Sequence, residues 1–294
     1  MRTPRKIVVA TDFSASADRA LDVALAIGAH GRAEIHLVHA LELPRAVFSP
    51  YAMAIPDDLI GGARDAARKK LDAAAEKLRA RGCAVTTTLG SVPASAALAG
   101  VAREVGADLV VIGSRGHTGL KRLALGSVAE LTVKESPVSV LTVRGEGHAE
   151  APKVIVAAAD FSDSSDRAVA LAADWAKAFG AQLHLVHALE LTMPFIAPYE
   201  VTVPNEILDK SYAEAVKRLV ALADSLSGVD VKTAVVSAAP HEAIDATAER
   251  VKADLIVTGS RGLRGLKHAL LGSVAERTLR HAPCSVLTVR SELG

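Results

Sequence analysis

Two copies of one glycine pattern are the part of this sequence best suited to bind a charged ligand. The first copy starts at Gly113-Ser114-Arg115-Gly116 and ends, nine residues later, at Gly126-Ser127. The second starts at Gly259-Ser260-Arg261-Gly262 and ends at Gly272-Ser273. Glycines let main-chain N–H groups approach an anion closely and can adopt positive φ, and Gly-Ser before a helix adds helix-terminal donors and a hydroxyl. The pattern therefore predicts a phosphate-binding loop, present twice.

The repeat extends well beyond the glycines and predicts two domains. Asp12 and Asp160 stand 148 positions apart, whereas the two glycine patterns stand 146 apart. A period near 147 is too long for a solenoid repeat and fits two domains of ordinary size. The polar stretch 144–152 separates them. We therefore expect one domain over residues 1–146 and a second over residues 151–294.

Composition narrows the class of protein. The 34 basic and 33 acidic residues leave a net charge of +1, so electrostatics predicts no nucleic-acid partner. Cys83 and Cys284 are not equivalent in the repeat, which predicts no disulfide framework and favours a reducing compartment. The apolar run Ile7 to Ala10 is too short for an export signal, and the longest charge-free stretch, 84–102, is too polar for a membrane span. We expect a cytoplasmic protein with no membrane partner.

Short apolar segments alternate with helical patterns in both halves. In the first half we expect strands at 6–10, 33–40, 84–89, 108–113 and 138–143, with helices at 14–29, 57–81, 93–104 and 127–135. The second-half strands are expected at 153–159, 182–188, 230–237, 254–259 and 285–289. Apolar strands separated by helices indicate parallel strands buried on both faces. The sequence therefore predicts two tandem α/β domains, each an open, doubly wound, parallel five-stranded sheet of Rossmann-like type.

Ligands bind such sheets beyond the carboxyl ends of the strands, where the strand order reverses. The first strand ends at Ala10-Thr11-Asp12 and the fourth at Gly113, so we expect the acid and the glycine loop to meet. The Ser127 hydroxyl could cap the following helix or meet a phosphate, and the main-chain donors of Ser127 and Val128 would face the same anion. Two alternatives stay open at this point: the glycines only make tight turns, and the aspartate only caps the first helix.

These motifs resemble the ATP-binding branch of the universal stress protein family. The resemblance rests on Ala10-Thr11-Asp12-Phe13-Ser14 after the first strand and on the glycine pattern after the fourth. It is strongest at 272–277 and at 281–287, and it covers both halves of the chain. The first half departs mildly, with Leu131 in place of Arg277. The resemblance implies a tandem stress protein of the adenine nucleotide alpha hydrolase-like fold that binds ATP, with or without Mg²⁺.

The resemblance also implies which residues hold the nucleotide. It assigns Asp12 and Asp160 to polar contacts with the nucleoside, and Val38 and Val186 to the adenine, although ordinary strand core would explain the valines equally well. The arginines of the loops would add charge near the phosphates or stay in solvent. The implied set is Ala10, Thr11, Asp12, Val38, Gly113, Ser114, Arg115, Gly116, Gly126, Ser127 and Val128, with Ala158, Ala159, Asp160, Val186, Gly259, Ser260, Arg261, Gly262, Gly272, Ser273 and Val274.

Other kinds of site find no support in the sequence. It contains no P-loop pattern and no dinucleotide fingerprint after the first strand. His36 and His39 stand three apart on one strand, on opposite faces, which argues against a shared metal. No motif marks a catalytic residue. We expect nucleotide-dependent stress-response or signalling activity with an unidentified protein partner; the alternatives are a slow ATPase serving a partner and a nucleotide-free interaction module.

Two further segments carry expectations. The long connections Leu41–Pro56 and Leu189–Pro204 hold four of the nine aromatic residues, which fits a lid, a partner surface or local packing equally well. The resemblance implies that the apolar final strands, 138–143 and 284–289, lie at sheet edges, and because an uncovered apolar edge invites aggregation we expect them to pair with each other. Such pairing would build an intramolecular pseudo-dimer, with a homodimer as the other possibility.

Overall fold

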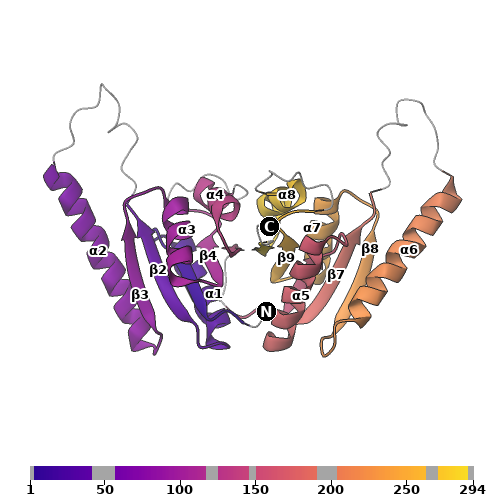
Figure 1. The fold of residues 1–294 in the computed structure, drawn as a ribbon, viewed down its shortest axis with the longest axis horizontal. Coiled ribbons are helices and arrows are strands. Elements are labelled where there is room, and N and C mark those ends of the chain that lie inside the picture. The colour runs from indigo at the N-terminus through magenta and orange to yellow at the C-terminus, as the bar shows by residue number, and fades with distance from the viewer. Residues whose placement is uncertain are drawn as a thin grey trace, which may run out of the picture. The chain divides into compact units, whose positions relative to one another are not determined.

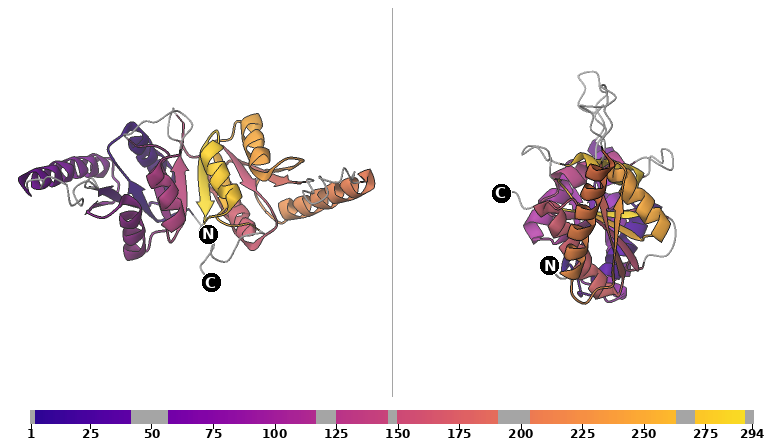
Figure 2. Two further views of the ribbon diagram at one scale, coloured as in Figure 1. Left: turned by 90° about the horizontal axis from the view of Figure 1, so that it is seen from above. Right: turned by 90° about the vertical axis from the view of Figure 1, so that its right-hand side faces the viewer.

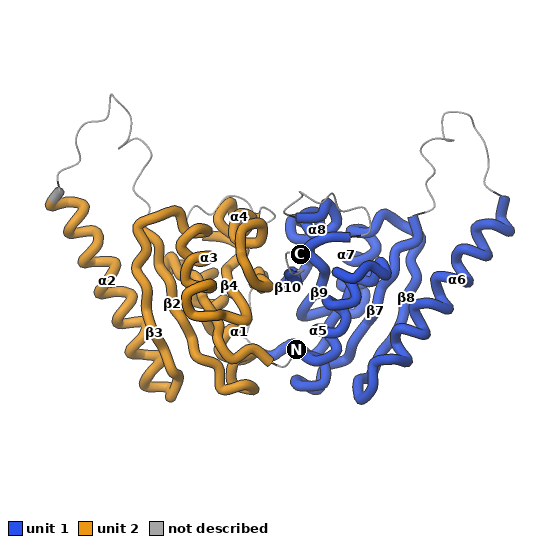
Figure 3. Tube along the Cα trace, viewed as in Figure 1, with its two compact units in different colours: residues 1–2, 151–294 blue, residues 3–150 orange. Residues whose placement is uncertain are grey.

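The computed structural model describes residues 3–41, 57–116, 125–145, 150–190, 204–262 and 271–290. The chain divides into two compact units, an N-terminal unit over Thr3–Glu150 and a C-terminal unit over Ala151–Gly294 (Figure 3). Each unit is an α/β fold built on parallel strands, as the alternation of apolar and helical segments predicts. The expected pairing of the two final strands concerns the placement of the units, and it stays a prediction.

The N-terminal unit contains a five-stranded sheet in the order β3-β2-β1-β4-β5 (Figure 1). Every pair of neighbouring strands in it is parallel. Its elements are β1 Lys6–Ala10, α1 Ala15–Ala29, β2 Glu34–Ala40, α2 Asp57–Ala80, β3 Val85–Gly90, α3 Ala94–Val105, β4 Leu109–Gly113, α4 Ser127–Glu135 and β5 Ser139–Val143. The strands lie within one residue of the expected ranges.

The C-terminal unit repeats this arrangement in the order β10-β9-β6-β7-β8, again with parallel neighbours. Its elements are β6 Val154–Ala158, α5 Asp163–Phe179, β7 Gln182–Ala188, α6 Asn205–Asp224, β8 Val231–Val236, α7 Pro240–Val251, β9 Leu255–Gly259, α8 Ser273–His281 and β10 Ser285–Val289. The repeat in the sequence is therefore a repeat of complete sheets.

Helices cover both faces of each sheet (Figures 1 and 2). In the N-terminal unit, α1 connects β1 to β2 and α2 connects β2 to β3, toward one edge of the sheet. Helices α3 and α4 connect β3 to β4 and β4 to β5, in the opposite direction across the sheet. Right-handed crossovers then place the first pair and the second pair on opposite faces. The strand order reverses between β1 and β4, so the crossovers diverge there. A crevice at the carboxyl ends of these two strands is the place where such sheets bind ligands.

Both faces of the central strands are buried, which explains their continuous apolar sequences. All five residues of β4 and all five of β9 are buried. Local signals set the helix ends: the Ser14 Oγ accepts a hydrogen bond from the Ala17 N–H at the start of α1, and Gly180 ends α5 in the left-handed conformation. Among the helices formed by the described residues, none is long and apolar enough to cross a membrane.

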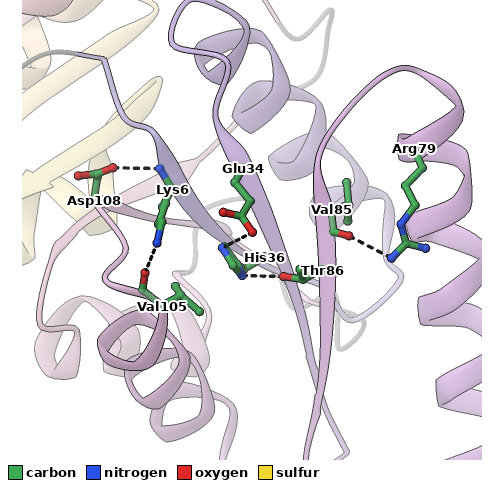
Figure 4. A network of polar contacts seen from close by, with 8 residues as sticks. All are labelled: Lys6, Glu34, His36, Arg79, Val85, Thr86, Val105 and Asp108. Carbon is green, nitrogen blue, oxygen red and sulfur yellow. Dashed lines mark hydrogen bonds and ion pairs between the residues drawn. The ribbon is translucent and has the colours of Figure 1, made fainter.

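A carboxylate fastens the start of the first strand in each unit. Asp108 precedes β4 and accepts a hydrogen bond from the Arg5 N–H at 2.8 Å. It also accepts one from the Lys6 N–H at 2.9 Å (Figure 4). The Lys6 Nζ donates to the carbonyl of Val105 at 2.9 Å. Asp254 makes the same pair of main-chain bonds in the C-terminal unit. These contacts fix β1 against β4 at the end of the sheet opposite the predicted site.

A buried histidine near the start of β2 differs in its surroundings from its copy in β7. His36 lies 3.5 Å from the Glu34 carboxylate and 2.6 Å from the Thr86 hydroxyl (Figure 4). Its copy, His184, donates from Nε2 to the Gln182 side-chain oxygen at 2.8 Å, because an amide oxygen can only accept. The neighbour of the histidine is thus an acid in one unit and a neutral amide in the other.

Burial lowers the pKa of His184, and the nearby charges of Lys232 and Arg250 lower it further against the opposing Asp230. The unfolded chain therefore binds this proton more readily than the folded chain. The free energy of unfolding of the C-terminal unit should therefore fall as the pH drops below the ordinary histidine pKa of 6.5 toward the lower pKa of the folded chain, and it should rise again as the pH is raised through the same range. Denaturant titrations between pH 7.5 and 5 would measure the slope.

A matched variant isolates this contribution. His184→Gln keeps an N–H donor at the Nε2 position but does not titrate, so its slope against pH should be flatter. Lys232→Met removes one of the charges that lower the pKa and should flatten the slope in part. Equal slopes in the native chain and in His184→Gln would contradict the prediction.

Candidate functional site

The turn after the first strand and the loop after the fourth strand meet in both units. A Cβ atom built on Gly116 would lie 2.8 Å from the Asp12 Oδ2. In the C-terminal unit the same construction on Gly262 gives 2.7 Å to the Asp160 Oδ2. The structure thus brings the aspartate and the second glycine of the pattern into direct contact, and only glycine leaves space for the carboxylate there.

The aspartate shapes the turn, whereas the serine two residues after it caps the helix. The Asp12 Oδ1 accepts a hydrogen bond from the Ser14 N–H at 3.0 Å, and Ser14 is the N-cap of α1. The Asp160 Oδ1 accepts from the Ser162 N–H at 3.0 Å and from its hydroxyl at 2.5 Å. Helix capping therefore belongs to the serines. The second carboxylate oxygen of each aspartate faces the glycine loop.

The first glycine of each pattern lies against the first helix of its unit. A Cβ on Gly113 would lie 2.5 Å from the Ser16 Oγ and 2.9 Å from the Ser16 carbonyl oxygen, and Gly259 meets Ser164 at the same two distances. This glycine lets the first helix of the unit pack directly on the end of the fourth strand. The close approach to the helix backbone explains why this position is a glycine, and its expected contact with the nucleotide stays a prediction.

None of the glycines of the two patterns adopts positive φ. Among the described glycines, those with positive φ are Gly82, Gly106, Gly145, Gly180 and Gly228, none of which belongs to either pattern. The pattern glycines are required by close approach of other atoms, as the short distances around them show. The left-handed residue of the site is instead a phenylalanine, with φ 64° at Phe13 and φ 60° at Phe161.

The third glycine starts the helix that follows the loop. Gly126 is the N-cap of α4, and its N–H donates to the carbonyl of Ser114 at 2.9 Å. Gly272 begins α8 in the same way, with 2.7 Å to Ser260. Ser127 is exposed as the first helical residue, and within the described residues no side chain caps this helix. The first-turn N–H groups, those of Ser127 and Val128 included, are donors of the kind that favour anions at helix N-termini.

The valine expected at the adenine is part of the sheet. Val38 is buried, and its carbonyl accepts a hydrogen bond from the Thr11 N–H at 2.9 Å. Val186 and Ala159 make the same bond at 2.9 Å. Each bond ties the residue before the aspartate to the second strand. The half-buried Ala10 and Ala158 end their strands beside it.

Arginines gather beside the loop of the C-terminal unit. The Arg261 N–H donates to the Ser164 Oγ at 3.4 Å, and within the described residues the buried Arg261 Nε has no hydrogen-bond partner. Burial and the charge of Arg261 lower the pKa of Arg290, which follows β10. The equivalent Arg115 is half-buried. The loop therefore lies in positive surroundings, which favour an anionic ligand.

Sequence reasoning missed several residues that build this site. They are Ser14 and Ser162, Ser16 and Ser164, Phe13 and Phe161, His39 and His187 as contacts of the turn, and Arg290. Their conservation between the two copies of the repeat is the signal that could have identified them. Residues 117–124 and 263–270, between the glycines, and the aromatics Phe48, Tyr51, Phe195 and Tyr199 lie outside the described residues. The described residues contain no cluster of His, Cys, Asp or Glu suited to a metal ion.

The fold and the site define a tandem α/β protein with one acid-and-glycine site at the strand ends of each unit. The family model described as the universal stress protein family matches residues 3–144 and again 152–290. The chain therefore belongs to the universal stress protein family and carries two copies of its domain.

Similar proteins agree with a doubled domain. A universal stress protein of Methanocaldococcus jannaschii is 38% identical over 141 residues, which is 47% of this chain and 82% of that protein. A Thermus aquaticus universal stress protein is 38% identical over 146 residues, covering 47% of this chain and 98% of its own. The chain is also similar to a solved universal stress protein structure from Archaeoglobus fulgidus, with a TM-score of 0.71 and 23% sequence identity. The match covers 98% of this chain and 98% of that one, and it shows a shared fold.

Proposed function

We propose that each unit binds ATP through its Gly-x2-Gly-x9-Gly-Ser loop, and that the chain acts as a nucleotide-dependent stress-response or signalling protein. One observation carries the proposal: a helix N-terminus that no described side chain caps lies on the loop whose second glycine touches the aspartate. The helix end suits phosphate, and the carboxylate suits a hydroxyl or amino donor of a nucleoside. The same pairing occurs in the C-terminal unit.

The proposed binding residues are those that the family resemblance implies, with revised roles. The N–H groups at the start of α4 and α8 would hold phosphate, and Asp12 and Asp160 the nucleoside. Gly113 and Gly259 would act indirectly, by bringing the first helix of each unit onto the strand end. A Mg²⁺ ion would arrive with the phosphates, which usually supply part of its coordination.

We propose a cytoplasmic protein that recognises an adenine nucleotide and a protein partner, with domains over residues 1–146 and 151–294. The alternatives are a slow ATPase that serves a partner and an interaction module that binds no nucleotide. Mass analysis of small molecules released from the purified, denatured chain separates them: ATP supports binding, ADP with AMP supports turnover, and no nucleotide supports the interaction module.

We expect slow hydrolysis of ATP by the purified chain. The donors and the aspartate would hold the nucleotide, but no residue of the described site is assigned as a base or as a water-positioning group for efficient phosphoryl transfer. Phosphate release should therefore stay below about 1 per second, the low end of typical enzymes. A faster rate that is lost in a chain with Gly126→Val and Gly272→Val would favour the ATPase.

A further inference from the structure

The turn after the first strand of each unit holds a phenylalanine in a conformation that bulky side chains rarely adopt. Phe13 has a φ of 64° and Phe161 a φ of 60°. A left-handed backbone at a bulky residue is costly, and surrounding contacts must hold it. Each phenylalanine directly follows the aspartate of the site. The contacts that hold the phenylalanine therefore also set the direction of the carboxylate.

A histidine at the end of the second strand contacts the residue before the aspartate. The His39 Nδ1 lies 2.8 Å from the Thr11 carbonyl oxygen, and the His187 Nδ1 lies 2.7 Å from the Ala159 carbonyl oxygen. A carbonyl oxygen can only accept, so Nδ1 carries the hydrogen and donates it. The bond orients the peptide group that joins the aspartate to the residue before it.

The same histidine ring contacts the residue after the aspartate. The ring centroids of His39 and Phe13 lie 4.5 Å apart at an interplanar angle of 40°. Those of His187 and Phe161 lie 4.6 Å apart at 37°. Such tilted contacts between rings are favourable. Each histidine therefore holds both neighbours of its aspartate.

Comparison of the two units shows which contact they share. The Thr11 Oγ1 accepts a hydrogen bond from the Phe13 N–H at 3.0 Å, but Ala159 occupies the equivalent position and has no hydroxyl. Phe161 nevertheless adopts the same conformation as Phe13. The threonine hydroxyl is therefore not required for the turn, whereas the histidine contacts occur in both units.

A cation over the phenylalanine ring is the more variable contact. The Lys70 Nζ of α2 lies 5.6 Å from the Phe13 ring centroid, and the Arg218 guanidinium carbon of α6 lies 4.2 Å from that of Phe161. Lys70 and Arg218 are both exposed, so water weakens the interaction. These cations provide matched controls for the histidines.

We propose that His39 and His187 are positioning residues of the candidate site. Each holds the peptide before its aspartate and the ring after it, so that one carboxylate oxygen bonds the helix-capping serine and the other faces the glycine loop. The effect on ligand binding rests on the proposed nucleotide function, whereas the effect on the turn does not depend on it.

Two paired substitutions separate the hydrogen bond from the ring contact. His39→Phe with His187→Phe keeps an aromatic face and removes the donor, and the Kd for ATP should rise about tenfold, as expected when a partly buried carbonyl loses its donor. His39→Asn with His187→Asn restores an N–H near the Nδ1 position, and Kd should stay within about threefold of the native value. The control pair, Lys70→Met with Arg218→Met, should change Kd less than about twofold.

A double-mutant cycle tests whether the histidines act through the aspartates. Asp12→Asn with Asp160→Asn keeps an acceptor for the serine N–H and removes the carboxylate charge. In that background the two His→Phe changes should raise Kd by less than about twofold, because a positioning residue loses its effect with the group that it positions. A full tenfold rise in that background would overturn the positioning role.

Amide hydrogen exchange tests the turn without any ligand. The Ser14 and Ser162 N–H groups donate to the aspartates. Their exchange should be about tenfold faster in the His→Phe chain and close to native in the His→Asn chain. Unchanged exchange in the His→Phe chain would overturn the proposal. Failure of the native chain to bind ATP would instead contradict the proposed function, and the exchange result would still decide the role of the histidines.

Discussion

Replacing Gly113 by alanine should lower the free energy of unfolding of the N-terminal unit by about 1–3 kcal/mol, the range for an overfilled core. The new Cβ would lie 2.5 Å from the Ser16 Oγ, 2.9 Å from the Ser16 carbonyl oxygen and 3.0 Å from its carbonyl carbon. The hydroxyl can rotate away, but the two main-chain atoms can move only with the helix. Helix α1 would therefore be displaced from β4, and the turn that holds Asp12 would move with it.

The C-terminal unit offers a cleaner measurement of the same effect. Gly259→Ala would meet Ser164 at the same distances, and Trp175, the single tryptophan of the chain, is buried on the helix that has to move. Denaturant titration followed by tryptophan fluorescence therefore reports on this unit directly. Gly259→Ala should move the midpoint to lower denaturant.

A glycine in open space provides the matched control. A Cβ on Gly100, inside helix α3, would have no neighbouring atom of the described residues within 4 Å. Gly100→Ala should therefore stabilise the N-terminal unit by about 0.5–1 kcal/mol, because alanine loses less backbone entropy in a helix. If Gly113→Ala and Gly100→Ala shifted the free energy of unfolding by the same amount and in the same direction, close helix packing would not be the reason that position 113 requires glycine.

Binding of ATP should raise the melting temperature of the chain. A ligand at one hundred times its dissociation constant adds about 2.7 kcal/mol per site, which corresponds to roughly 5–10 °C for a domain of this size. Gly126→Val should abolish the gain of the N-terminal unit, because its two methyl groups would lie where phosphate meets the first N–H groups of α4. Gly272→Val should do the same for the C-terminal unit. Thermal melts with and without ATP measure both.

The native backbone at these positions makes the valine variants informative. Gly126 has a φ of −67° and a ψ of 145°, which valine adopts readily, and a Cβ there would lie 3.3 Å from the Ser114 carbonyl oxygen. The variants should thus fold with a modest loss of stability. Gly100→Val controls for the added side chain. Equal ATP-induced shifts in the native chain and in the double variant would contradict the proposed site.

The sequence alone determined the doubled domain, the type of each element and the meeting of the aspartate with the glycine loop. The central strands could be placed within one residue because a strand buried on both faces needs a continuous apolar run. Asp12 and Gly116 could be brought together because the carboxyl ends of parallel strands lie at one edge of the sheet. Both arguments use signals that are local along the chain.

Only the tertiary structure decided what each residue does inside the site. Gly113 lies against a helix about a hundred positions earlier in the chain, a contact that its expected place in an anion site did not indicate. His39, near the end of the second strand, bonds the carbonyl of Thr11, the residue before Asp12, across 28 positions. His36 and His184 occupy equivalent positions, yet their neighbours carry different charges. These roles depend on distances between atoms that the fold brings together from remote positions, and residue type and spacing along the chain do not contain those distances.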